Sequence, residues 1–267
     1  KSLTESGYRV EQPPLPRIFG VFFNQNQATV FINKEVREAL SISIDRDAIV
    51  KEVLAGYGTI ITSPVPGTPI NTNVINDDVT GDITSSGIER AIALLENAGW
   101  SIDKETGIRT KKNKKGSESL EFTITTSNAL ELKKVAELLK SKWEALGAKV
   151  TIELYEVGAL NQEIIRPRKY DALLFGEIIG RDFDLFAFWH SSPRNDPGLT
   201  IAMYANIKAD ALLEKIRTTD NRKERLESFE RFEKEIQNDI LLQSHRRLYS
   251  RDMQKMLSKR RQIPSTK

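Results

Sequence analysis

The chain has 267 residues, enough for one large domain or two small ones, and its 39% hydrophobic and 29% charged residues are ordinary for a soluble globular protein. It has no cysteine, which excludes a disulfide scaffold, a zinc–thiolate site and a cysteine nucleophile, and its two histidines cannot build a multi-histidine metal centre. The net charge of +3 is small and gives no reason to expect nucleic acid or an anionic membrane as a partner.

No stretch approaches the ~18–20 apolar residues of a membrane span, so no direct span is expected. The opening residues KSLTESGYRV lack the apolar core of a signal peptide. We therefore expect any export signal to have been removed or to lie outside this chain.

The first predicted elements are a strand and two helices. Residues 17–24 are rich in Phe, Ile and Val and are bounded by PPLP and NQNQ, which predicts a buried strand. Asn33 stands where a helix N-cap belongs, and Asp45 is placed to cap a second helix. Gly56 is expected to end that second helix in the left-handed conformation.

The middle of the chain predicts a strand–helix–strand unit. A Pro- and Asn-rich surface loop covers 62–78, and a helix is expected at about 86–98. Apolar residues at three- and four-residue steps predict a helix at about 129–146, between strands at 120–126 and 148–156. Such a unit requires a right-handed crossover.

Between these elements, residues 107–127 read as a hairpin with a lysine-rich turn. The run Lys111-Lys112-Asn113-Lys114-Lys115 has two interpretations, a nucleic-acid patch or a solvated hairpin tip. The hairpin tip is favoured, because a short charge run between two strands is usually a solvated turn.

The last third continues the pattern. It predicts a helix at 158–166, a strand at 170–179 that is apolar enough to be buried on both faces, and a short helix at 184–190. Two amphipathic helices follow near 208–218 and 221–239, the second capped by Asp220. The fold class is α/β, with helices packed on a mixed β-sheet around one core.

Few residues point to catalysis or a cofactor. Gly56-x-Gly58 follows a helix and is no dinucleotide fingerprint. Asp182-Phe183-Asp184 can hold a cation or cap the short helix, and capping is favoured because too few further oxygen ligands are nearby. His190 is interpreted as a packed or hydrogen-bonded residue rather than a general base. No cofactor and no metal site are expected, and the aromatic and polar loop residues indicate binding.

The segments resemble, in order, the extracytoplasmic solute-binding proteins of peptide ABC importers, the oligopeptide/dipeptide-binding family (family 5). The residues that carry the resemblance are FFNQN (22–26), VREALSISIDRDAIVKEVLAGYG (36–58), SPVPG (63–67), AIALLENAGW (91–100), GIRTKKNKKGSESLEFTITTS (107–127), VAELLKSKWEALGAKVTIE (135–153), YDALLFGEIIGRDFDLFAFWHSS (170–192) and DPGLTIAMYANIKADALLEKIRTTD (196–220). Each motif alone is weak, but eight in the correct order are specific.

The resemblance implies two lobes that close on an extended peptide, of which this chain is the C-terminal lobe; the missing N-terminal lobe precedes FFN. It implies a peptide ligand, the permease subunits of an ABC transporter as partners, and an extracytoplasmic location. Its typical members are about twice as long. We expect ligand contacts from the loops that contain the following residues: Tyr57, Asp182, Phe183, Tyr204 and Asn206. A protein-interaction module is the first alternative, and a hydrolase using Asp182, Asp184 and His190 is the second.

The chain is expected to divide into an extended segment at 1–16, one lobe at 17–243 and a basic tail at 244–267. Members of the family usually continue after the last helix with a proline and an apolar, aromatic strand. Here seven Lys or Arg residues stand between Arg246 and Arg261, against one Asp. We therefore expect the tail to be a poor core strand, partly disordered or helical on the surface.

Overall fold

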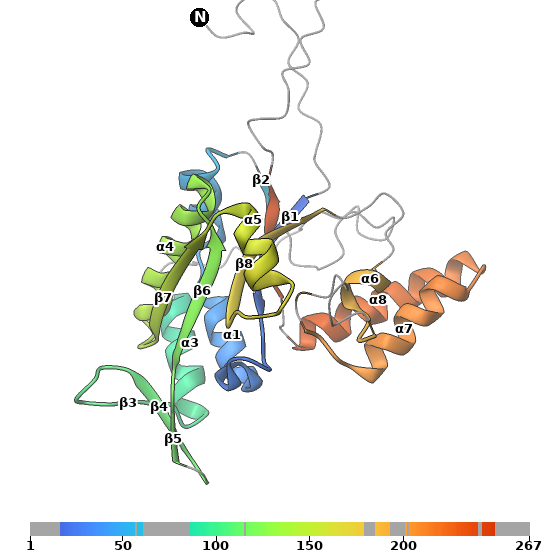
Figure 1. The fold of residues 1–267 in the computed structure, drawn as a ribbon. Coiled ribbons are helices and arrows are strands. Elements are labelled where there is room, and N and C mark those ends of the chain that lie inside the picture. The colour runs from blue at the N-terminus through green and yellow to red at the C-terminus, as the bar shows by residue number, and fades with distance from the viewer. Residues whose placement is uncertain are drawn as a thin grey trace, which may run out of the picture.

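A computed structural model describes residues 17–56, 58–60, 86–114, 116–178, 185–192, 201, 203–239 and 242–248. The main sheet has six strands in the order β2-β9-β1-β8-β6-β7, and a separate small sheet has the order β3-β4-β5 (Figure 1). The strands are β1 (Arg17–Phe23), β2 (Gly58–Thr59), β3 (Ser101–Ile102), β4 (Arg109–Asn113), β5 (Gly116–Ser119), β6 (Glu121–Ser127), β7 (Lys149–Tyr155), β8 (Ala172–Ile178) and β9 (Leu242–Leu248).

The helices lie close to the positions that the sequence predicts. They are α1 (Lys34–Ile42), α2 (Arg46–Ala48), α3 (Ser86–Asn97), α4 (Leu130–Glu144), α5 (Val157–Ala159), α6 (Phe186–Trp189), α7 (Ile207–Thr218) and α8 (Arg222–Asp239), with a 3-10 turn η1 (Thr29–Ile32) and π-helical turns η2 (Ile49–Val53) and η3 (Leu160–Ile165). The two π-helical turns directly continue α2 and α5, so each pair is one helical segment.

The predicted strand–helix–strand unit is confirmed. Strands β6 and β7 are parallel, with Glu121 opposite Lys149 and Ser127 opposite Tyr155, and helix α4 connects them. Strand β8 is parallel to β6 on its other side, and β1 is antiparallel to β8. The sheet is therefore mixed, as the sequence predicts.

The main sheet is buried on both faces, so the apolar side chains form two clusters where the sequence predicts one core. Neighbouring residues of β1 alternate between the clusters, with Val21 and Phe23 in one and Phe22 in the other. Helices α1, α3 and α4 cover the first face, and the α5–η3 segment with α6, α7 and α8 covers the second (Figure 1). The prediction that the β8 segment is buried on both faces is confirmed by Leu173 and Leu174, which enter opposite clusters.

Two predicted helix caps differ from the structure. Asp45 caps α2 as expected, accepting from the Ala48 backbone N–H at 2.9 Å. Asn33 is the N-cap residue of α1, but its amide donates to the Val30 carbonyl at 3.2 Å and caps nothing. At α8 the capping side chain is Asn221 rather than Asp220.

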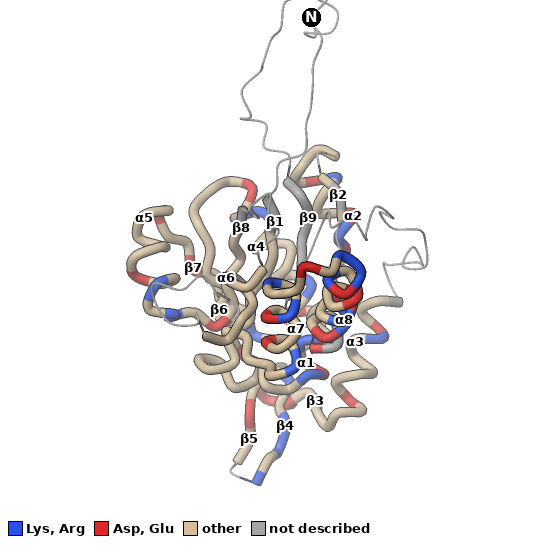
Figure 2. The backbone as a smooth tube through the Cα atoms, turned by 90° about the vertical axis from the view of Figure 1, so that its right-hand side faces the viewer, with Lys and Arg blue, Asp and Glu red and all other residues tan. Residues whose placement is uncertain are grey.

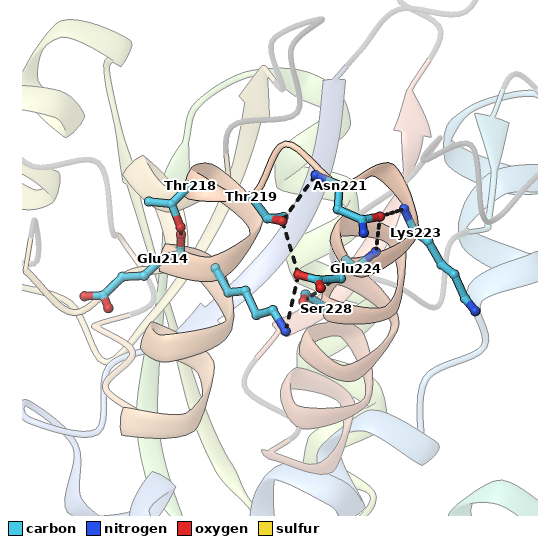
Figure 3. Close-up of polar contacts among 8 residues, drawn as sticks. Glu214, Thr218, Thr219, Asn221, Lys223, Glu224 and Ser228 are labelled. Carbon is cyan, nitrogen blue, oxygen red and sulfur yellow. Dashed lines mark hydrogen bonds and ion pairs between the residues drawn. The ribbon is translucent and has the colours of Figure 1, made fainter.

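The turn between α7 and α8 shows why Asn221 is the cap (Figure 3). Its side-chain oxygen accepts from the backbone N–H groups of Lys223 and Glu224, at 3.0 and 3.4 Å. The Glu224 carboxylate in turn accepts from the Thr219 hydroxyl at 3.3 Å and lies 3.9 Å from the Lys215 ammonium. Asn221 immediately precedes the first helical residue, which is the position from which a side chain reaches those free donors.

The prediction that the tail at 244–267 is a poor core strand, partly disordered or helical, is partly wrong, because residues 242–248 form strand β9. This strand lies between β2 and β1 and is antiparallel to both. Strands pair through backbone N–H and C=O groups, which do not depend on the side chains. Residues 242–248 can therefore pair with β1 as a strand, although their basic composition disfavours one. Residues 249–267, and the segment at 1–16, lie outside the described residues.

Candidate functional site

The parallel strands β6, β7 and β8 end at one side of the sheet, which we call the carboxyl edge and define by Ser127, Tyr155 and Ile178. Register pairs Ser127 with Tyr155 directly, and β8 runs in the same direction beside β6. In open α/β sheets, ligands bind outside the carboxyl ends of the strands. This edge is therefore the first place to seek a site.

The other three strands of the sheet also meet this edge. Arg17, the first residue of β1, pairs with Ile178, and Leu248, the last residue of β9, pairs with Gly58 of β2. The described chain thus enters β1 and leaves β9 at the same edge. A second lobe joined to the chain at the start of β1 and at the end of β9 would therefore lie over the carboxyl edge.

Three exposed apolar side chains lie at or next to the ends of β6 and β7. Leu130 is 62% exposed, Val157 is 59% exposed and Leu154 is 40% exposed. Leu130 and Val157 are the first residues of α4 and α5, so both stand where a helix leaves the carboxyl edge. Exposed apolar residues at one edge are available to contact a ligand or a second body.

Hydrogen bonds join and cap the backbone segments that carry these side chains. The Asn128 N–H donates to the Tyr155 carbonyl at 2.8 Å, which ties the end of β6 to the end of β7. The Glu156 carboxylate caps α5, accepting from the Gly158 N–H at 3.4 Å. The Tyr155 hydroxyl donates to the Glu153 carboxylate at 3.4 Å, and the negative charge of that carboxylate raises the pKa of the phenol. The ends of β6 and β7 are therefore tied together, with exposed apolar side chains at or next to them.

Three of the five predicted ligand contacts, Tyr57, Asp182 and Phe183, lie outside the described residues. The described residues that flank them, Gly58 and Ile178, are both at the carboxyl edge. The role of all five residues in ligand binding stays a prediction.

Tyr204 and Asn206 are placed elsewhere, at the junction of α7 with the end of α8. The Tyr204 hydroxyl donates to the Asp239 carboxylate at 2.7 Å, and the Asn206 amide donates to the same oxygen at 2.9 Å and to Glu235 at 3.0 Å. The Asn206 side-chain oxygen also caps α7, accepting from the Lys208 N–H at 2.9 Å. Their polar groups are thus used to join two helices.

The same junction is tied to the first half of the chain by Arg37, a residue of the VREAL motif. Its guanidinium donates to the main-chain carbonyl of Asp239 through Nε and Nη2, at 3.1 and 2.8 Å, and to the carbonyls of Phe31 and Ile32 through Nη1. Burial lowers the pKa of Arg37, and the charges of Asp239 and Glu35 partly offset this. A guanidinium stays charged in proteins, so it binds the carbonyl end of α8 favourably.

Tyr204 is itself buried, and burial raises the pKa of its phenol well above the ordinary value. The hydrogen bond to Asp239 and the charge of that carboxylate raise it further. Asp239 begins the connection to β9, whose first residue pairs with Phe22 near the end of β1. The junction therefore adjoins the end of the sheet opposite to the carboxyl edge.

His190 follows the preferred interpretation as a packed, hydrogen-bonded residue. Its ring stacks on Phe186 with centroids 4.0 Å apart, and Nδ1 lies 2.8 Å from the Ser192 hydroxyl. Nε2 lies 3.4 Å from the Glu214 carboxylate, and the Arg217 guanidinium covers the Phe186 ring at 4.8 Å. These contacts fix α6 against α7.

Within the described ranges, His, Asp and Glu side chains form no group that could hold a metal ion. None of the helices in those ranges is both long and apolar enough to cross a membrane. Asp182 and Asp184, the carboxylates of the hydrolase alternative, are outside these ranges. The described part of the carboxyl edge offers exposed apolar side chains for contact with a ligand or a second body.

Sequence reasoning missed the apolar residues of the carboxyl edge. A signal was present, since Leu130 lies just outside the buried stripe of α4 that begins at Leu132. Leu130 is apolar, stands in the first turn of a helix that follows a strand, and does not belong to the buried face of that helix. Such a residue indicates contact with a ligand or a second body.

A mixed sheet with helices on both faces, and with three exposed apolar side chains at its carboxyl edge, matches a lobe of the periplasmic-binding-protein type. The chain belongs to the bacterial extracellular solute-binding proteins, family 5 Middle, whose family model matches residues 2–198.

Characterised relatives bind different solutes. The oligopeptide-binding protein AppA of Bacillus subtilis is 27% identical over 212 residues, which cover 79% of this chain and 38% of that protein. The nickel-binding protein NikA of Staphylococcus aureus is 27% identical over 227 residues, covering 83% of this chain and 39% of that protein. The chain spans less than half the length of these relatives.

Solved structures share the fold. The oligopeptide-binding protein AppA from Bacillus subtilis, in complex with a nonapeptide, matches with a TM-score of 0.76 at 23% identity, over 90% of this chain and 46% of that one. NikZ from Campylobacter jejuni, in complex with Ni(L-His), matches with a TM-score of 0.73 at 22% identity, over 92% of this chain and 48% of that one.

Proposed function

We propose that this chain is the C-terminal lobe of an extracellular solute-binding protein that captures extended peptides and delivers them to the permease subunits of an ABC importer. The observation that carries the proposal is the carboxyl edge, where the strand ends, three exposed apolar side chains and both ends of the described sheet come together. A second lobe connected through β1 and β9 would close over this edge.

The chemistry of the edge suits a peptide of varied sequence. An extended peptide is recognised mainly through its backbone, while roomy apolar pockets accept different side chains. Leu130, Leu154 and Val157 offer apolar contact without a fixed charge, so they select no particular side chain. The similarity to the oligopeptide-binding protein AppA supports the same ligand class.

Binding between two lobes also explains why this chain alone should bind weakly. Ligands of this kind gain affinity from burial on most of their surface, and one edge supplies contact on one side only. We therefore expect the complete gene product to bind peptides at least ~100-fold more tightly than this chain, a difference of about 2.7 kcal/mol.

The test is calorimetry and native mass spectrometry of the complete gene product, freed of bound ligand and offered a mixed peptide library. Retention of peptides, with much weaker retention by the isolated chain, supports the proposal. A folded protein that retains no peptide from the library contradicts it. Capture of a nickel–histidine complex instead, measured in the same experiment, overturns the peptide assignment while keeping the solute-binding class.

A further inference from the structure

The small sheet carries a lysine-rich tip that the proposed function does not use. Strands β4 and β5 form a two-stranded ribbon that extends away from the main sheet (Figure 1). Lys112 and Lys114 are exposed near its end, and Lys111, half-buried, lies one pair further back, opposite Glu118. Figure 2 shows Lys and Arg positions along β4, and the register places Glu118, the acidic residue of β5, opposite Lys111 and not at the tip.

The charge of this tip is unbalanced. The segment 111–117 contains no Asp or Glu. Glu118 is opposite Lys111 in the ribbon, but its carboxylate accepts from the Thr29 hydroxyl at 2.9 Å and lies 3.5 Å from the Asn33 amide. Among the described residues, no ion pair joins a tip lysine to an acid. The net charge of the chain is small, yet the tip is a local concentration of positive charge.

The composition of the tip restricts the class of partner. Residues 110–119 include no aromatic and no aliphatic side chain. Protein interfaces depend on buried aromatic and Arg anchors and are depleted in Lys, and single-stranded nucleic acids are held by stacking on aromatic rings. The tip has neither kind of anchor, so it lacks what a specific protein site or a single-stranded nucleic-acid site needs.

The positions of the lysines on the ribbon also argue against a protein partner. Side chains alternate along a strand, so Lys111 and Lys112 project from opposite faces of the ribbon. A flat protein patch would meet only one of these faces. A layer of mobile phosphate groups can surround the end of a ribbon and contact lysines on both faces, and Lys acts as a flexible point charge.

We propose that the β4–β5 tip is an electrostatic docking site for anionic lipid headgroups. Each lysine near an anionic bilayer contributes about a fivefold increase in partitioning at physiological salt, and the three described lysines act together. Because the attraction is between exposed charges, it is screened within a Debye length of roughly 8 Å at physiological ionic strength. The proposal is independent of peptide binding.

The test is vesicle flotation of the 267-residue chain, with vesicles of phosphatidylglycerol mixed with phosphatidylcholine and vesicles of phosphatidylcholine alone. We expect binding to the anionic vesicles only, and loss of binding at about 0.5 M NaCl. The variant K111Q/K112Q/K114Q should partition at least ~10-fold less than the parent chain. All three side chains lie on a surface ribbon, so thermal unfolding should be unchanged.

The matched control is K133Q/K134Q/K208Q, which removes the same charge from exposed helix positions. It should bind anionic vesicles like the parent chain. A second comparison is K259Q/R260Q/R261Q, because the basic residues after 248 compete as the source of binding. The proposal is overturned if the tip variant still binds vesicles while the 259–261 variant does not. It is also overturned if the tip variant and the control variant lose binding equally.

Discussion

The guanidinium of Arg37, in helix α1, donates two hydrogen bonds to the main-chain carbonyl of Asp239, 202 residues later at the end of α8. The Asp239 carboxylate in turn accepts from Tyr204 and Asn206, before α7. A single buried cation thus connects a helix on one face of the sheet to the helical hairpin on the other. It acts where the chain turns from α8 toward strand β9.

Substituting Arg37 by Ala should lower the free energy of unfolding by about 3 kcal/mol, because the buried carbonyl of Phe31 and the part-buried carbonyls of Ile32 and Asp239 lose a charged donor at once. Urea unfolding followed by circular dichroism measures the change. Arg90→Ala, which removes an exposed arginine from α3, is the matched control and should stay within ~0.5 kcal/mol of the parent. A loss of equal size in both variants would show that Arg37 has no special role.

Tyr204→Phe removes the hydrogen bond to Asp239 and should cost about 1–2 kcal/mol. Burial raises the pKa of Tyr204 in the folded protein, so the fold favours the protonated phenol. The stabilisation from this group is complete below about pH 10, the ordinary tyrosine pKa, and is lost as the pH rises toward the folded value. Stability measured from pH 8 to 11 should therefore fall more steeply in the parent chain than in Y204F. Parallel curves for the two proteins would contradict this assignment.

Gly147→Ala should destabilise the protein by about 2–3 kcal/mol, for two reasons that add. Gly147 has φ of +85°, and a Cβ there would displace the end of the half-exposed Ile102 side chain, which can move, and would approach Arg109 Cγ to 3.0 Å. Hydrogen bonds to buried carbonyls restrain Arg109 from moving away.

The matched control for this change is Gly107→Ala. Gly107 has φ of +72° but no heavy atom near the added Cβ, so only the backbone strain of about 1 kcal/mol remains. Thermal and urea unfolding of the two variants separate strain from collision. Equal destabilisation would mean that the collision at Gly147 is relieved without cost.

Val157→Glu and Leu130→Glu test the carboxyl edge in the complete gene product. Both side chains are exposed, so we expect unfolding to shift by less than ~1 kcal/mol. Peptide affinity should fall about tenfold, because a charge would be desolvated when the second lobe closes. Ile207→Glu, at an 88% exposed position at the start of α7, should leave affinity unchanged. Unaltered affinity in both edge variants would place the ligand elsewhere.

Local patterns predicted the helices and the central strands well. In α4 the residues Leu132, Val135, Leu139 and Trp143 are buried, as their three- and four-residue spacing requires. Asp45 and Gly56 act at their helix ends as expected. Each of these features depends on interactions within a few residues, so the local sequence contains the information that decides it.

The composition of residues 242–248 indicated no strand, and the apolar stripe of α4 did not mark Leu130 as part of an edge. Both were decided by tertiary structure, because β9 is held by backbone groups of β1 and β2, and the carboxyl edge exists only once β6, β7 and β8 are in register. Family membership and the α/β fold are thus encoded in the sequence pattern. The position of the candidate site follows from long-range pairing, which joins residues that no local pattern relates.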